Sequence, residues 1–108
     1  MTSFNDRERA FEAKFAQDEE IQFRIIARRN RLLGEWAGEK MGLNPAEADA
    51  YAKSVVQADF EEAGPDDVVR KLLGDIINAG VDIDEATVRA ALEEQEVIAR
   101  RMFIEPKN

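Results

Sequence analysis

The cations that could bind an anionic ligand are concentrated in one short segment of the sequence. Arg24, Arg28 and Arg31 recur at spacings of four and three residues, which places them near one another on the outer side of a helix. Guanidinium groups bind phosphate through paired hydrogen bonds, so this cluster could recognise a phosphate group. The alternative is a solvated basic face that balances the acids of the other helices, and the absence of a Gly-rich loop nearby favours it.

A stripe of phenylalanines near the N-terminus could bind a protein partner. Phe4, Phe11 and Phe15 fall within about 40° of one another on a helix that turns by about 100° per residue. Charged residues occupy the rest of this helix surface: Asp6, Arg7, Glu8, Arg9, Glu12 and Lys14. The stripe either folds back as ordinary core or enters a groove on another protein as an amphipathic helix.

Two opposite charges interrupt apolar helix faces. Arg29 and Asp59 each have apolar neighbours on both sides of the face on which they lie. Because an unpaired buried charge is unfavourable, we hypothesise that the two side chains pair across the first and second helices. The alternative is that one or both side chains extend to the rim of the core and remain in water.

The composition excludes several classes of chemistry. The 108 residues include no Cys and no His, so disulfides, thiolate chemistry and imidazole metal ligands are absent. No nucleophile is paired with a base and no Glu-x-x-His pair occurs, so neither an enzyme nor a metal site is expected. The net charge of -8 argues against general nucleic-acid binding. With no long apolar run, the protein is expected to be cytoplasmic, without direct membrane insertion.

Helix-end signals divide the chain into four helices, and nothing in it is typical of a strand. Glycines that can end a helix stand at three positions: Gly42, Gly64 and Gly80. Asn44 and Glu47 form a capping box before the second helix, and Asp84 can cap the fourth. The predicted fold is all-α, a four-helix bundle over residues 19–104 with helices at about 19–41, 45–63, 66–79 and 85–103.

The first helical stretch is longer than this bundle needs. No proline occurs between Asn5 and Met41, which predicts one long helix or two helices joined near residues 17–18. Such a stretch extends roughly 55 Å, whereas the other helices span roughly 20 to 28 Å. Residues 1–18 are therefore expected to form a mobile N-terminal arm, extended or disordered until it finds a partner.

Three strings of the sequence resemble a known family. They are SFNDRERAFEAKF at residues 3–15, ARRNRLLG at 27–34 and AYAKSVVQADFEEAG at 50–64. In these strings the chain resembles the zeta subunit of the alphaproteobacterial F-type ATP synthase. The resemblance covers nearly the whole chain, and it is specific because several long strings agree in order and spacing.

The resemblance implies a four-helix bundle with a mobile N-terminal inhibitory segment. In the family this segment enters a catalytic interface of F1, between the alpha and beta subunits and near gamma, and blocks ATP hydrolysis while sparing synthesis. By analogy, the inhibitory segment runs from about residue 1 to residue 18. Its anchors are the three phenylalanines, and its polar contacts are Arg7, Arg9 and Lys14.

The resemblance also implies that the bundle binds ADP or ATP as a regulatory ligand; no other cofactor is expected. The segment from Arg24 to Arg31 is where we expect the phosphates, with Trp36 or Tyr51 as a stacking partner. The protein is expected to be monomeric when free and to lie at the cytoplasmic face of the inner membrane when bound to F1. Alternatives are a small nucleotide-sensing module and an adaptor that binds through the bundle face.

Overall fold

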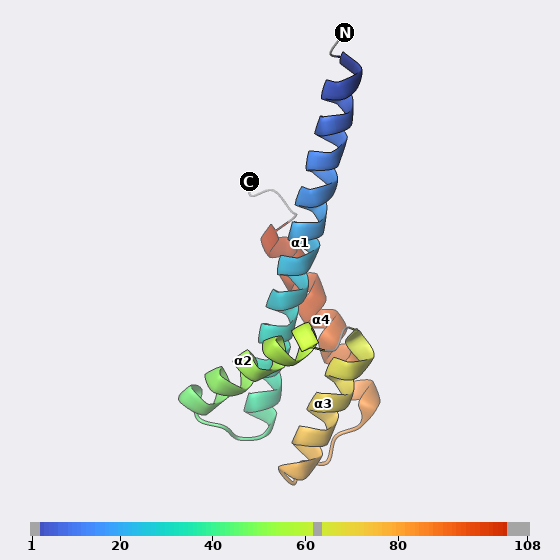
Figure 1. Ribbon diagram of the computed structural model, residues 1–108. Coiled ribbons are helices and arrows are strands. Elements are labelled where there is room, and N and C mark those ends of the chain that lie inside the picture. Colours follow the sequence, from blue (N-terminus) through green and yellow to red (C-terminus); the bar gives the residue numbers. More distant parts are fainter. Residues whose placement is uncertain (1–2, 62–63, 104–108) are drawn as a thin grey trace.

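The fold consists of four α-helices, seen here in a computed structural model (Figure 1). It describes residues 3–61 and 64–103, and the side chains of residues 18–58 and 64–103. The helices are α1 (Ser3–Lys40), α2 (Pro45–Glu61), α3 (Pro65–Asn78) and α4 (Glu85–Phe103). No strand occurs among the described residues, so the predicted all-α, four-helix fold is confirmed.

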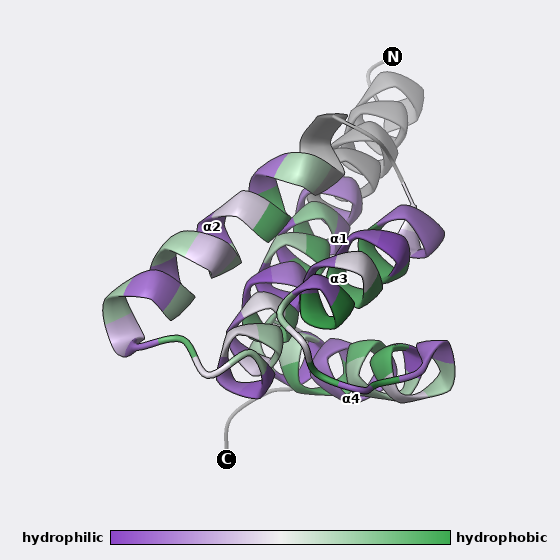
Figure 2. Ribbon diagram, turned by 90° about the horizontal axis from the view of Figure 1, so that it is seen from below, coloured by the Kyte–Doolittle hydropathy of each residue, from purple (hydrophilic) through white to green (hydrophobic). Residues whose placement is uncertain are grey.

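The central element is α1. The other three helices all pack against it, and α3 also packs against α2 and α4 (Figures 1 and 2). In the part of the chain that the structure describes, α2 and α4 do not contact each other. The two helices therefore lie on α1 with a space between them, which becomes important for the site.

The predicted helix caps are present. The Asn44 Oδ1 accepts a hydrogen bond from the Glu47 N–H at 2.8 Å, and the Glu47 Oε1 accepts one from the Asn44 N–H at 3.0 Å. The Asp84 Oδ1 accepts hydrogen bonds from both the N–H and the hydroxyl of Thr87, at 2.9 and 2.6 Å. These bonds satisfy backbone donors that have no partner within a helix, which is why α2 and α4 begin where they do.

Two of the predicted glycines end helices in the same way. Gly42 and Gly80 have φ angles of 76° and 86°, a conformation that glycine adopts without the penalty of a Cβ atom. The residue after each glycine donates back to a carbonyl five residues earlier: Leu43 to Gly38 at 3.0 Å and Val81 to Ile76 at 3.2 Å. This is the Schellman arrangement, and it reverses the chain after α1 and after α3.

The core lies where all four helices meet. Its fully or nearly fully buried side chains are apolar and come from every helix: Leu33, Ala37, Val55, Val68, Val69, Leu72, Ile76, Val88, Ala91 and Leu92. Figure 2 shows that the hydrophobic residues of α3 are turned towards α1 and α4. Further along α4 the apolar residues are less covered, since Ile98 and Met102 are 42% and 51% exposed.

An unusually close contact joins α1 and α2. A Cβ atom added to Gly34 would lie 2.7 Å from the Ala52 Cα, and one added to Gly38 would lie 3.1 Å from the Ala48 Cβ. The two helices therefore cross almost backbone to backbone. The absence of a Cβ atom at Gly34 and Gly38 permits this distance.

The proposed division into an arm at residues 1–18 and a bundle at 19–104 stays a prediction. The backbone helix α1 is assigned from Ser3, but the side chains of residues 3–17 lie outside the described part of the chain. Among the helices described, none is long and apolar enough to cross a membrane.

Candidate functional site

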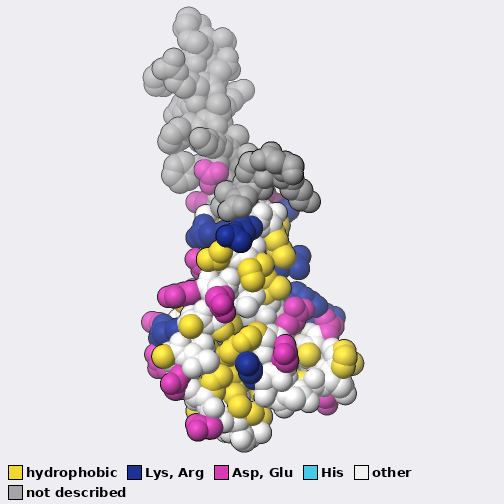
Figure 3. Space-filling model, turned by 180° about the vertical axis from the view of Figure 1, so that it is seen from behind, with side chains coloured by type: hydrophobic (Ala, Val, Ile, Leu, Met, Phe, Trp, Pro, Cys, Tyr) yellow, Lys and Arg dark blue, Asp and Glu magenta, His cyan; other side chains and the backbone are white. Residues whose placement is uncertain are grey.

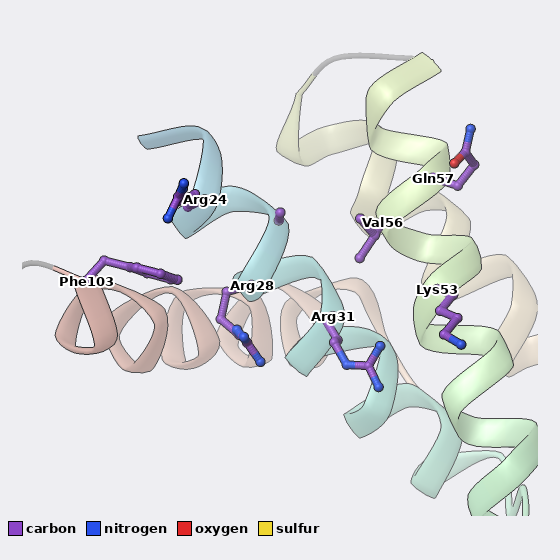
Figure 4. A pocket seen from close by; sticks show the side chains of 8 residues that line it. Arg24, Arg28, Arg31, Lys53, Val56, Gln57 and Phe103 are labelled. Atoms are coloured by element: carbon purple, nitrogen blue, oxygen red, sulfur yellow. The ribbon is translucent and has the colours of Figure 1, made fainter. Parts of the chain in front are cut away.

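A pocket of about 490 Å³ opens between α1, α2 and the end of α4. It lies in the space that α2 and α4 leave between them on α1. Its walls combine cations with apolar and aromatic side chains (Figure 4): Arg24, Ala27, Arg28, Arg31, Lys53, Val56, Gln57 and Phe103. Figure 3 shows blue Lys and Arg side chains mainly in the upper part of the described surface, whereas magenta acids are spread over the whole face.

Helix geometry explains why these side chains meet. Arg24, Arg28 and Arg31 are four and three residues apart, so they lie along one side of α1. The close contact between Gly34 and Ala52 holds α2 beside that same side of α1, which brings Lys53 to the pocket. As Figure 4 shows, α4 supplies its last residue, Phe103, as the opposite wall.

Two of the four cations are engaged by one carboxylate. Asp49 of α2 pairs with Arg31 across the helix interface and with Lys53 on its own helix at 3.2 Å. The hydrogen bond to Asp49 raises the pKa of Arg31. The hydrogen bonds from Arg31 and then from Lys53 hold the pKa of Asp49 below its ordinary value. Both effects keep the charged forms in place, so these two cations are partly neutralised.

The other two cations are more available to a ligand. Arg24 pairs with Glu20 at 2.8 Å, but both side chains are well exposed, and such surface pairs contribute little. Arg28 lines the pocket and has no carboxylate partner among the described residues. It is therefore the cation that an anionic ligand could engage without displacing an existing ion pair.

The chemistry of the pocket suits an anion that carries a flat or apolar group. Arg28 offers a planar fork of N–H donors, and Phe103 offers an aromatic face (Figure 4). The described residues that line the pocket include no nucleophile with a base beside it. Within the part of the chain described, no group of three acidic side chains could hold a metal ion.

The structure brings together the three predicted arginines but not the two predicted aromatic partners. The Trp36 ring does not line the pocket; its face is contacted by the Lys40 Nζ, 5.8 Å from the ring centre. Tyr51 donates a hydrogen bond to Asp75 of α3 at 2.7 Å. Burial, and then this hydrogen bond, raise the pKa of the Tyr51 hydroxyl.

The sequence interpretation missed Lys53 and Phe103. The chain reverses at Gly42, so α1 and α2 form an antiparallel hairpin. A hairpin that places Gly34 opposite Ala52 also places Lys53 close to Arg31. Aligning the two helices outward from the turn could therefore have predicted that Lys53 lines the pocket. No comparable signal existed for Phe103, because its position depends on the packing of α4 against α1.

Arg29 is buried, as the hypothesis of a buried pair requires, and is only 5% exposed. The carboxylate beside it comes from α4: the Arg29 Nη1 lies 3.1 Å from the Glu96 Oε1. The proposed partner on α2, Asp59, lies outside the described side chains, so pairing with Asp59 stays a prediction. The side chains of the predicted inhibitory segment are also outside them: Phe4, Arg7, Arg9, Phe11, Lys14 and Phe15.

Comparison with known proteins identifies the family. A family model for ATPase inhibitor subunit zeta matches residues 1–102. A protein structure solved by solution NMR is similar, with 46% sequence identity and a TM-score of 0.67; the match covers 80% of this chain and 99% of that chain. No curated protein matches the chain. Because the family match spans nearly the full length, the chain belongs to the ATPase inhibitor subunit zeta family and is a regulatory subunit of ATP synthase, not an enzyme.

Proposed function

We propose that this chain inhibits ATP hydrolysis by inserting its N-terminal segment, residues 1–18, into a catalytic interface of F1. The interface lies between the alpha and beta subunits, near gamma. The observation that carries the proposal is the family match over residues 1–102, which includes the whole segment. The phenylalanine stripe supports it, because one narrow apolar edge on a charged helix suits a groove.

The binding energy of the segment alone is modest. Burying Phe4, Phe11 and Phe15 contributes roughly 5 to 9 kcal/mol. Ordering the segment opposes this by about 2 to 5 kcal/mol. Effective inhibition therefore needs a second contact made by the bundle, which would raise the local concentration of the segment to about millimolar.

Inhibition of purified F1 tests this proposal. We expect the full chain to lower ATP hydrolysis, and both a chain without residues 1–18 and the Phe4→Ala, Phe11→Ala, Phe15→Ala variant to lose inhibition. A peptide of residues 1–20 should inhibit more weakly than the full chain, because it lacks the bundle contact. Full inhibition by the shortened chain would contradict the proposal and favour an adaptor that binds through the bundle face.

We further propose that the basic pocket binds ADP or ATP. The phosphates would lie against Arg28 and Arg24, and the adenine would stack on Phe103. Support comes from Arg28, which has no carboxylate partner among the described residues, and from the aromatic wall opposite it. Arg31 would act less directly, because Asp49 already holds it.

Titration with ADP, followed by amide chemical shifts, tests the nucleotide site. We expect shifts at residues 24–31, around Lys53 and at the end of α4. Arg28→Gln should weaken binding at least about tenfold, as expected for the loss of a charge-assisted contact. Arg70→Gln, on an exposed part of α3, is the matched control and should leave the affinity unchanged. Shifts confined to α3 would discard this placement.

A further inference from the structure

A second hollow, of about 370 Å³, lies along α1 at the end of the proposed inhibitory segment. The described residues that line it all come from this one helix: Asp18, Glu19, Gln22, Phe23 and Ile26. At about 100° per residue, these positions are centred about 175° around α1 from the arginines of the basic pocket. The hollow therefore opens on the other side of the helix.

The floor of this hollow is apolar and partly exposed. Phe23 and Ile26 are three residues apart, so their side chains are neighbours on the helix surface. They are 54% and 37% exposed, although Ile25 beside them is 1% exposed and forms part of the core. The bundle thus buries Ile25 in its own core and leaves Phe23 and Ile26 partly exposed on another side of this segment.

The rim of the hollow is acidic. Asp18 and Glu19 are exposed, and neither has an ion-pair partner among the residues that the structure describes. The next acid, Glu20, is engaged with Arg24 towards the basic pocket. Two carboxylates without counter-charges beside an apolar floor complement a surface that presents lysine or arginine next to an apolar side chain.

We propose that this surface, defined by Asp18, Glu19, Phe23 and Ile26, docks the bundle onto a basic, apolar segment of an F1 subunit. The inference rests on the proposed function. Phe23 follows residue 18 by five residues, or about 7.5 Å along the helix. When residues 1–18 are inserted into the catalytic interface of F1, this surface therefore lies at the entrance of that interface. Contact there supplies the second interaction that the binding energy requires.

The charge of the surface favours this occupant over two others. A nucleotide would be repelled by Asp18 and Glu19. A second copy of this chain carries a net charge of -8, so two copies repel each other over long range. A second copy could still present its own basic pocket, and the experiment is designed to detect that outcome.

Site-specific photo-crosslinking of the full chain tests the proposal. A photoreactive phenylalanine analogue placed at Phe23 should form a crosslink with an F1 subunit, at a peptide that contains lysine or arginine. The same analogue at Ile77, a 52% exposed position on α3, is the matched control and should not form that crosslink.

Inhibition titrations give a second readout. The Phe23→Ala, Ile26→Ala variant should raise the half-inhibitory concentration about tenfold, because it removes apolar contact area. Asp18→Lys combined with Glu19→Lys should have a similar effect that becomes smaller at high salt. Ile77→Ala, and Glu93→Lys combined with Glu94→Lys on α4, should leave inhibition unchanged. Circular dichroism of every variant confirms that the helices are retained.

The outcomes separate this inference from the function on which it rests. If the unmodified chain inhibits F1 but the crosslink is absent and the Phe23→Ala, Ile26→Ala variant inhibits fully, the docking surface is wrong and the inhibitory function stands. If the crosslink forms but the unmodified chain does not inhibit, the docking surface stands and the function is wrong. Crosslinks between two copies of the chain would overturn the proposed occupant.

Discussion

Arg29 of α1 and Glu96 of α4 form an ion pair in the interface between their helices, with 3.1 Å between Nη1 and Oε1. Arg29 also donates from Nε to the Asn30 Oδ1 at 3.1 Å. The arginine side chain is almost fully buried, whereas the glutamate keeps about a third of its surface exposed. The pair links α4 to α1 seven residues before Phe103, which lines the basic pocket.

Removing the glutamate should destabilise the fold, because Arg29 would remain buried without its counter-charge. We expect Glu96→Ala to lower the free energy of unfolding by about 2 kcal/mol, less than for a fully buried pair because Glu96 is partly in water. Urea denaturation measures this. Glu94→Ala, an exposed acid on the same helix, is the control and should change stability by no more than about 0.5 kcal/mol.

A double-mutant cycle identifies the partners of Arg29. We expect a coupling energy of at least about 1 kcal/mol between Arg29→Met and Glu96→Ala. The sequence-based hypothesis of a pair with Asp59 is tested in the same way, and strong coupling between Arg29→Met and Asp59→Ala is its expected outcome. If the losses of stability in either cycle are additive, the residue tested in that cycle is not a partner of Arg29.

Gly34 and Gly74 should respond oppositely to the same substitution. Gly34→Ala places a Cβ 2.7 Å from the Ala52 backbone, so α2 must move; we expect a loss of about 1 to 3 kcal/mol. Gly74 lies within α3 with nothing within 4 Å of its added Cβ, so Gly74→Ala should stabilise by about 0.5 to 1 kcal/mol. Urea denaturation of both variants checks this pair, and equal effects would contradict the close crossing.

The cap at Asp84 predicts how stability depends on pH. Hydrogen bonds from the Thr87 hydroxyl and N–H lower the pKa of Asp84 in the folded state. A carboxylate with a lowered pKa stabilises the fold above its unfolded pKa and loses this contribution as the pH falls through its folded pKa. The melting temperature of Asp84→Ala should therefore lie below that of the unmodified chain at pH 7, and the difference should shrink below about pH 4. A difference in melting temperature that stays constant from pH 7 to below about pH 4 would contradict this.

Inhibition should be nearly independent of pH between 6.5 and 8. The sequence has no histidine, the side chain that ordinarily titrates in this range. Among the described residues, the pKa values that the structure perturbs move away from neutral pH. The pKa values of Asp49 and Asp84 are lowered, and those of Arg31, Tyr51 and Arg89 are raised. The half-inhibitory concentration, corrected for the pH profile of F1 itself, should stay within about twofold. A steep change across this range would require a titrating group elsewhere in the chain.

The helices could be predicted because their signals are local. Asn44, Glu47 and Asp84 form their caps within a few residues of sequence, and Gly42 and Gly80 reverse the chain where they stand. Such interactions do not depend on which helix lies beside them, so spacing alone identifies them.

The parts of the site that could not be predicted depend on contacts between helices. Arg24, Arg28 and Arg31 share one helix side, so their meeting was predictable from spacing. Phe103 and Glu96 reach α1 only through the register of α4, which no local pattern encodes. Trp36 offered an aromatic ring of suitable chemistry, but the structure places it outside the pocket, against Lys40.

The crossing at Gly34 and Gly38 has a consequence for related chains. Because α1 and α2 touch at these two glycines, the spacing between the two helices depends on the absence of a Cβ atom there. The distance between Arg28 and Lys53 therefore depends on these glycines as well as on the cations themselves. A relative that keeps every arginine but carries serine or valine at the first of these positions would spread its helices apart. Its pocket should then be wider, even though the residues that line it are identical.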